Sequence, residues 1–88
     1  MEAMDASMKQ MDRQMAAAPM NGDVDHDFAA MMIPHHQGAI DMAKAELSYG
    51  KDPVMLRLAQ EIVVDQQSEI EAMQLWLTKK ADSKEDKR

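Results

Sequence analysis

The sequence of 88 residues contains no cysteine, only three glycines, three prolines and three aromatic side chains. The absence of cysteine excludes disulfides, thiolate metal sites and cysteine nucleophiles. Because glycine and proline are scarce, long segments run without a break, and any core must be built from aliphatic and methionine side chains. The chain also lacks a run of 18 apolar residues, so we expect no membrane insertion. These absences indicate a small helical domain.

The formal net charge of -6 is unevenly distributed. Residues 79–88 carry five Lys and Arg against three Asp and Glu, which leaves five against thirteen in residues 1–78. An acidic surface repels phosphate backbones and anionic headgroups but tolerates cations, so nucleic acid and membranes are poor candidate partners. We predict a single domain over residues 1–80 and a charged, flexible tail over residues 81–88.

Hydrophobic periodicity predicts three helices. The first covers the methionine-rich start of the chain, and the second runs from about residue 25 to residue 49. The third begins at Pro53, with Asp52 as its cap, and continues to about residue 80. Three helices joined by short turns predict an all-α, antiparallel three-helix bundle.

Methionine accounts for 11 of the 88 residues. In the first helix it recurs at alternating steps of three and four residues, which is the spacing of a helix that buries one seam. Leucine would specify a packed seam better, yet no seam position is Leu, Ile or Val. We therefore interpret the seam as both core and a reservoir of sulfur donors. Leaving aside the initiator position, its members are Met4, Met8, Met11 and Met15.

The stretch MMIPHHQGAIDM, residues 31–42, combines methionine with histidine. Met31 and His35 are four residues apart, as are Met32 and His36, so each pair can converge above the helix surface. His35 and Met42 lie two turns apart on nearly the same face. Thioether and imidazole together favour Cu(I) or Ag(I) and are poor donors for Ca²⁺ and Mg²⁺. Any one of these residues could equally be a packing residue, but their clustering favours a metal site.

His26 lies among acidic residues at the start of the second helix. Carboxylates at Asp23, Asp25 and Asp27 suit the positive end of the helix dipole, so the cluster can be read as a capping region. The same side chains could instead bind a hard ion or Zn²⁺.

Two polar residues interrupt the apolar stripe of the third helix. Gln66 and Glu69 could hydrogen-bond the imidazoles of His35 or His36 and orient them toward a metal. They could also be edge positions in solvent.

Signs of catalysis are weak. The chain has neither Glu-x-x-His nor His-Glu-x-x-His, and its hydroxyl residues lie in no recognisable nucleophile elbow. We therefore expect no enzyme and assign no catalytic residue.

Two segments resemble a known family. DHDFAAMMIPHHQGAIDMA, residues 25–43, resembles the signature of the domain-of-unknown-function 305 (DUF305) family, and LAQEIVVDQQSEIEAMQLWL, residues 58–77, resembles its second conserved helix. The resemblance covers roughly residues 20–78, and the first helix is less typical.

This resemblance implies a ferritin-like bundle in an exported bacterial protein, with relatives among CopM-like periplasmic copper-binding proteins that serve copper resistance. It implies copper ligands at Met31, Met32, His35, His36, Met42 and Met73. Because a three-helix chain would leave an apolar seam uncovered, a homodimer that completes four-helix-type packing is expected.

We therefore expect a periplasmic or secreted protein that sequesters Cu(I) or hands it on, with a copper exporter or oxidase as its partner. Two alternatives stay open. One is a structural or adaptor bundle whose methionine-rich faces bind a partner helix. The other is a bundle that binds Zn²⁺ or Cu(II) through His26, His35, His36 and carboxylates.

Overall fold

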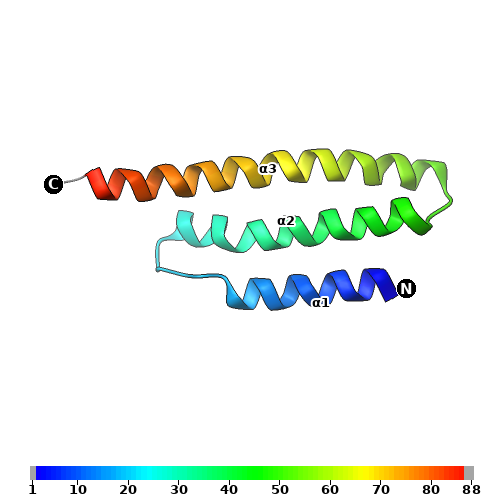
Figure 1. The fold of residues 1–88 in the computed structure, drawn as a ribbon, viewed down its shortest axis with the longest axis horizontal. Coiled ribbons are helices and arrows are strands. Elements are labelled where there is room, and N and C mark those ends of the chain that lie inside the picture. Colours follow the sequence, from blue (N-terminus) through cyan, green and yellow to red (C-terminus); the bar gives the residue numbers. More distant parts are fainter. Residues whose placement is uncertain (1, 87–88) are drawn as a thin grey trace.

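The structure is a computed structural model that describes residues 2–86. It contains three α-helices, which are α1 (Glu2–Ala17), α2 (Val24–Tyr49) and α3 (Pro53–Asp86). Each helix runs antiparallel to the next, and the turns between them are short (Figure 1). The predicted all-α, antiparallel three-helix bundle is confirmed.

The three helices form a single layer with α2 in the middle (Figure 1). Both α1 and α3 pack along α2, but within residues 2–86 α1 and α3 do not pack on each other. The molecule measures 56 × 22 × 16 Å, so it is long and thin. Because only one layer is present, each helix keeps much of its surface exposed.

Short polar residues fix where the helices begin. The carboxylate of Asp23 accepts a hydrogen bond from the backbone N–H of His26, so Asp23 caps α2. Asp52 caps α3 as predicted, because its carboxylate accepts a hydrogen bond from the N–H of Met55. Both caps satisfy N–H groups that have no partner inside the helix.

Small side chains fill the contacts between the helices. Apart from Gly38, the buried residues of the described chain are Ala29, Ala30, Ile40, Ala43, Ala45, Ala59 and Ile70. None of the described side chains larger than isoleucine is buried, and α1 contributes no buried residue. The core is therefore thin, and the larger apolar side chains lie at its edges.

The third helix continues to Asp86, beyond the predicted end near residue 80. Residues 81–86 of the predicted tail are thus helical, and residues 87 and 88 lie outside the described part.

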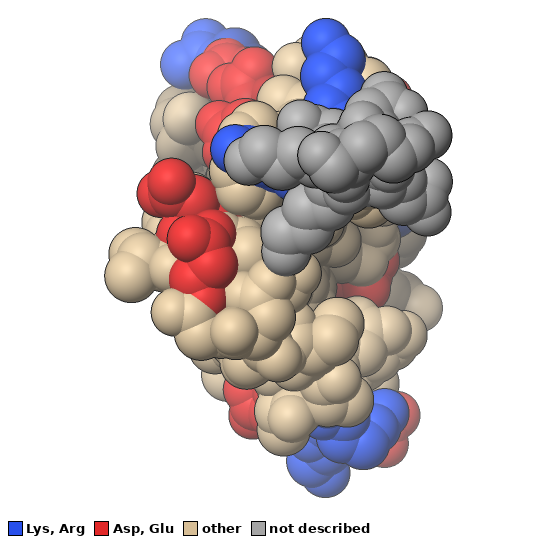
Figure 2. All heavy atoms as spheres, turned by 90° about the vertical axis from the view of Figure 1, so that its left-hand side faces the viewer, with Lys and Arg blue, Asp and Glu red and all other residues tan. Residues whose placement is uncertain are grey.

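None of the described helices is long and apolar enough to cross a membrane. Figure 2 views the end of the layer where α2 begins, and it shows acidic side chains gathered on one flank of that end.

Candidate metal centre

The two broad sides of the helix layer differ in chemistry. One side, here named the methionine face, has two grooves lined mainly by large apolar residues. The first groove is lined by Met4, Ala39, Met42, Ala43, Glu46, Met55, Leu58, Ala59 and Ile62, and the second by Asp25, Phe28, Ala29, Ala72, Met73 and Trp76. The other side, here named the glutamine face, carries Gln14, Gln37, Gln67 and Gln74 in its grooves.

The imidazole of His36 is held between α2 and α3. Its Nε2 lies 2.5 Å from Oε1 of Glu69, and the side chain of His36 is 13% exposed. A carboxylate partner places the ring proton on Nε2, so Nδ1 presents its lone pair. Nδ1 is buried and has no hydrogen-bond partner among the described residues. Of the two polar candidates on the third helix, Glu69 is therefore the one that orients a histidine.

An unpartnered buried nitrogen destabilises the fold by about 1–3 kcal/mol, because the atom has lost its water without gaining another partner. A ligand that accepts the Nδ1 lone pair would remove this cost. A helical side chain leans over the preceding turn of its own helix, so His36 leans toward Met32, which is half-buried. The predicted pairing of His36 with Met32 is thus geometrically feasible.

Met73 reaches the same level from α3. It lies four residues after Glu69, while Met32 lies four residues before His36. Because α2 and α3 are antiparallel and His36 is bonded to Glu69, these two steps of one turn bring Met32 and Met73 level with each other. We define the histidine-methionine cluster as Met32, His36 and Met73.

His35 lies beside this cluster but is exposed. Its ring centroid is 5.9 Å from that of His36, and the two rings are tilted by 60°. Met31, one turn earlier on α2, is half-buried. Helical spacing places Met31 and His35 on the α1 side of the methionine face. The two predicted Met/His pairs therefore flank α2, with one pair toward α1 and the other toward α3.

Met42 belongs to a different group. It is six residues from His36, which corresponds to about 9 Å along the helix axis. There it shares a groove with Met4 of α1 and Met55 of α3. The predicted ligands thus do not form one cluster. Met55 was not predicted, although its place among methionines from three helices makes it a further sulfur donor at this second position.

The remaining methionines of α1 lie along its contact with α2. Met11 packs directly against Gly38. In the antiparallel register that this contact sets, Met15 lies level with Pro34, close to His35 along the helix axis. Met15 is half-buried and Met8 is 48% exposed. The methionine seam of α1 is therefore only partly buried by the rest of this chain.

His26 serves the turn between α1 and α2. Its Nδ1 lies 3.0 Å from Oδ1 of Asp27, and the same carboxylate accepts hydrogen bonds from the backbone N–H groups of Asn21 and Gly22. The bonds from His26 and from the two backbone groups hold the pKa of Asp27 below its ordinary value. This geometry fits a turn that is fixed by hydrogen bonds.

No convergence of three His, Asp or Glu side chains occurs within the part of the chain that the structure describes. His26 and His35 are nine residues apart, which separates them by about 13 Å along α2. The three histidines of one chain therefore do not surround one ion.

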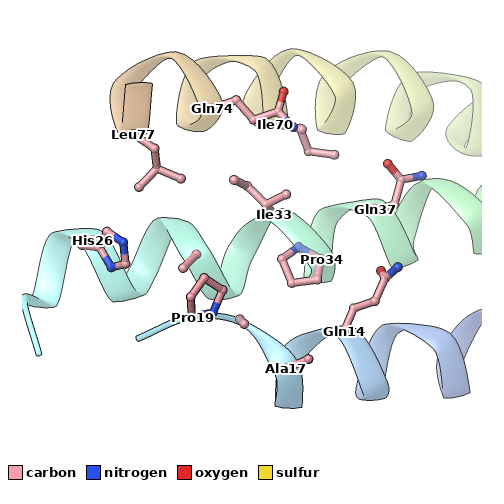
Figure 3. Close-up of a pocket in the computed structure, with 12 residues that line it drawn as sticks. Gln14, Ala17, Pro19, His26, Ile33, Pro34, Gln37, Ile70, Gln74 and Leu77 are labelled. Atoms are coloured by element: carbon pink, nitrogen blue, oxygen red, sulfur yellow. The ribbon is translucent and has the colours of Figure 1, made fainter. Parts of the chain in front are cut away.

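The glutamine face has a groove of about 530 Å³ near the start of α2 (Figure 3). Ile33, Pro34 and Leu77 supply apolar lining, and Gln14, Gln37 and Gln74 supply amides. Of the predicted metal ligands, only His26 reaches this groove. The soft donors thus lie away from it, on the methionine face or in the contact between α1 and α2.

The chain was compared with known proteins. Residues 1–77 match the family described as "Domain of unknown function (DUF305)". A 49-residue stretch is 43% identical to the "Uncharacterized protein L153" of Acanthamoeba polyphaga mimivirus. That stretch covers 56% of this chain and 32% of the viral protein, so the chain spans about a third of that relative's length. The match over nearly all of its three helices shows that the chain belongs to the DUF305 family.

Proposed function

We propose that this protein binds Cu(I), and Ag(I) in its place, and that it sequesters the ion or hands it on without catalysing a reaction. The observation that carries this proposal is the state of His36. Glu69 holds Nε2, while Nδ1 is buried without a protein partner. Metal-binding histidines usually have this arrangement, with one ring nitrogen bonded to a carboxylate and the other free for the metal.

The neighbouring donors suit a soft ion. Met32 and Met73 are level with each other, one helical turn from His36, and methionine side chains are flexible enough to turn their sulfur toward a bound ion. Met31 and His35 could extend the site toward α1. Thioether and imidazole favour Cu(I) over hard cations, and the net charge of -6 favours accumulation of any cation. The methionines around Met42, together with those of α1, would hold further ions or exchange them.

The same proposal includes a biological setting. We propose a periplasmic or secreted location and a role in copper resistance, with a copper exporter or an oxidase as the partner that gives or receives the ion. The chain has no cysteine, and thioethers can bind Cu(I) in an oxidising compartment without forming disulfides. The ferritin-like architecture belongs to this proposal as well.

The two alternatives have unequal support. An adaptor bundle is favoured by the exposed apolar side chains of the methionine face, such as Phe28 and Leu58. A site for Zn²⁺ or Cu(II) built from three histidines is less well supported, because His26 lies far from His35 and is already bonded to Asp27. The copper proposal accounts both for the many methionines and for the unpartnered Nδ1 of His36.

A competition experiment tests the proposal. The protein is titrated with Cu(I) in the presence of a chelator of known affinity, and the bound fraction gives the dissociation constant. The double substitution His35→Ala and His36→Ala should weaken binding more than Met8→Leu with Met15→Leu, since imidazole is the stronger donor and seam sulfurs can replace one another. If the methionine substitutions weaken Cu(I) binding as much as the histidine substitutions, or more, the main site lies on α1. If the unmodified protein takes no Cu(I) from the chelator, the proposal is wrong.

A further inference from the structure

The methionine face exposes large apolar side chains. Those that line its grooves and stay exposed are Phe28 (63% exposed), Met55 (46%), Leu58 (41%) and Ile62 (39%). They come from α2 and α3 and extend along most of the layer. The buried positions of the same helices are mostly alanine. The chain thus leaves larger apolar groups outside than it places inside.

The total surface of the chain exceeds that of a typical folded monomer of its mass. The accessible surface of the chain is 6373 Å². A folded monomer of 9.9 kDa is expected to expose about 5,200 Å². The excess, roughly 1,200 Å², is at least the area that one subunit buries in a standard interface, about 800 Å². The surface is therefore sufficient for a stable pair of chains.

The glutamine face is less suited to such pairing. One of its grooves is lined by Gln37, Lys44, Gln67, Glu71 and Gln74, together with two isoleucines. Charged and amide groups would have to lose water on contact, whereas the apolar groups of the methionine face gain from burial. The methionine face is the side that a second copy would cover.

Symmetry and charge favour an antiparallel pair. A two-fold interface brings the same patch of both copies together, and an apolar patch is complementary to itself. Lys80 lies over the Trp76 ring at one end of this face, and Glu46 lines the groove at the other end. When two layers run antiparallel, the Lys80 end of one copy meets the Glu46 end of the other. Asp25 lies at the same end as Lys80, so that end is mixed in sign, whereas a parallel pair would bring the two Glu46 side chains to the same end.

The antiparallel pair would also bring the histidines together. Because α2 spans residues 24–49, its midpoint lies between His36 and Gln37. A two-fold axis across this midpoint places His35 of each copy beside His35 of the other. Within one chain His35 is exposed and lies 5.9 Å, ring to ring, from His36. The second copy would therefore bury the side chain of His35, which is exposed in a single chain.

We infer that two copies of this chain pair antiparallel through the methionine face, and that His35 of both copies completes the Cu(I) site at the axis of the pair. The shared site depends on the copper binding proposed above, whereas the pairing does not.

The pairing is tested by the mass of the protein in solution, measured by light scattering after size-exclusion chromatography. The unmodified chain should have twice the mass of 9.9 kDa. Leu58→Glu should weaken pairing about a hundredfold or more and give a monomer, because its carboxylate would have to be desolvated. Leu75→Glu is the matched control, since Leu75 is 55% exposed, belongs to the same helix and lines no groove of this face. Phe28→Glu provides a second test at a site that is too exposed to affect folding.

The results separate the two parts of the inference. An unmodified protein that stays monomeric with and without Ag(I) overturns the pairing, and so does a Leu58→Glu variant that stays dimeric and helical by circular dichroism. If Leu58→Glu is monomeric, its affinity for Cu(I) should fall about tenfold or more although it keeps every proposed ligand. A monomer with unchanged affinity overturns the shared site. A dimer that binds no Cu(I) refutes the copper proposal and supports the pairing.

Discussion

The side chain of Met11 occupies the space that a β carbon on Gly38 would need. A β carbon built on Gly38 would lie 2.5 Å from Sδ of Met11 and 2.7 Å from its Cβ and Cγ. The backbone of α2 therefore approaches α1 closely at this point. Glycine is unfavourable inside a helix by about 1 kcal/mol relative to alanine, so its presence here indicates a packing requirement.

Gly38→Ala should therefore destabilise the protein by about 1–2 kcal/mol, because the clash with Met11 outweighs the gain in helix propensity. Thermal unfolding followed by circular dichroism measures the change. Adding Met11→Ala to Gly38→Ala should recover part of the loss, since it removes the clashes with Sδ and Cγ and leaves only the contact with the Met11 Cβ. A more stable Gly38→Ala protein would show that α1 does not pack as described.

Glu69→Gln should weaken Cu(I) binding by about 10–100-fold, the usual effect of altering the carboxylate that orients a metal-binding histidine. The amide can still accept a hydrogen bond from His36, but it lacks the negative charge of the carboxylate and so makes a weaker bond to the ring. Chelator competition measures the affinity. Glu71→Gln is the control, since Glu71 lies on the glutamine face. If the two substitutions weaken Cu(I) binding equally, Glu69 contributes only through the net charge of the protein and does not orient His36.

Ag(I) should displace bound Cu(I), because both ions are soft and the proposed donors are sulfur and imidazole. A tenfold excess of Zn²⁺, which is worth about 1.4 kcal/mol, should leave the copper in place. Metal analysis after dialysis measures what stays bound. Displacement by zinc but not by silver would instead identify the methionines as packing residues and favour the site for Zn²⁺ or Cu(II).

Acid should destabilise the turn before α2. The pKa of Asp27 is lowered in the folded chain, chiefly by the hydrogen bond from His26, so its charged form stabilises the fold above the ordinary aspartate pKa of 3.8. This contribution is lost as the pH falls through the lowered value. Thermal midpoints should therefore differ between the unmodified protein and Asp27→Asn at pH 7.

That difference should shrink as the pH falls below the ordinary value of 3.8, because the Asp27 carboxyl of the unmodified protein is then progressively neutralised. Asp25→Asn is the control, because Asp25 is exposed and is not the carboxylate that binds the turn. A difference that stays constant over the whole pH range would mean that the effect of the substitution is not electrostatic.

The sequence is sufficient to predict the helices because their signals are local. Asp52 and Pro53 mark the start of α3, and the end of α2 at Tyr49 follows from the turn residues behind it. The sequence offers both Asp23 and Asp25 as caps of α2, because neighbouring aspartates can each serve, and the structure shows that Asp23 is the cap. The end of α3 was placed too early, since a mixed charge pattern is compatible with both a helix and a tail.

The arrangement of the helices was less predictable. Periodicity gives the direction in which each side chain leaves its own helix, but it does not give the register between two helices. The bond between His36 and Glu69, which are 33 residues apart, depends on that register. The separation of Met42 from the histidines and the contact of Met11 with Gly38 depend on it as well. An isolated glycine within an apolar helical pattern was the available signal for the latter contact.

The order in which the helices pack has a consequence for folding kinetics. Each contact joins helices that are neighbours in sequence, so no long loop has to close before a native contact forms. Chains dominated by such local contacts fold in microseconds to milliseconds. The pair formed by α2 and α3 can assemble before α1 docks. Because α1 contributes no buried residue, it should also be the first helix to open, and its amide hydrogens should exchange with solvent fastest.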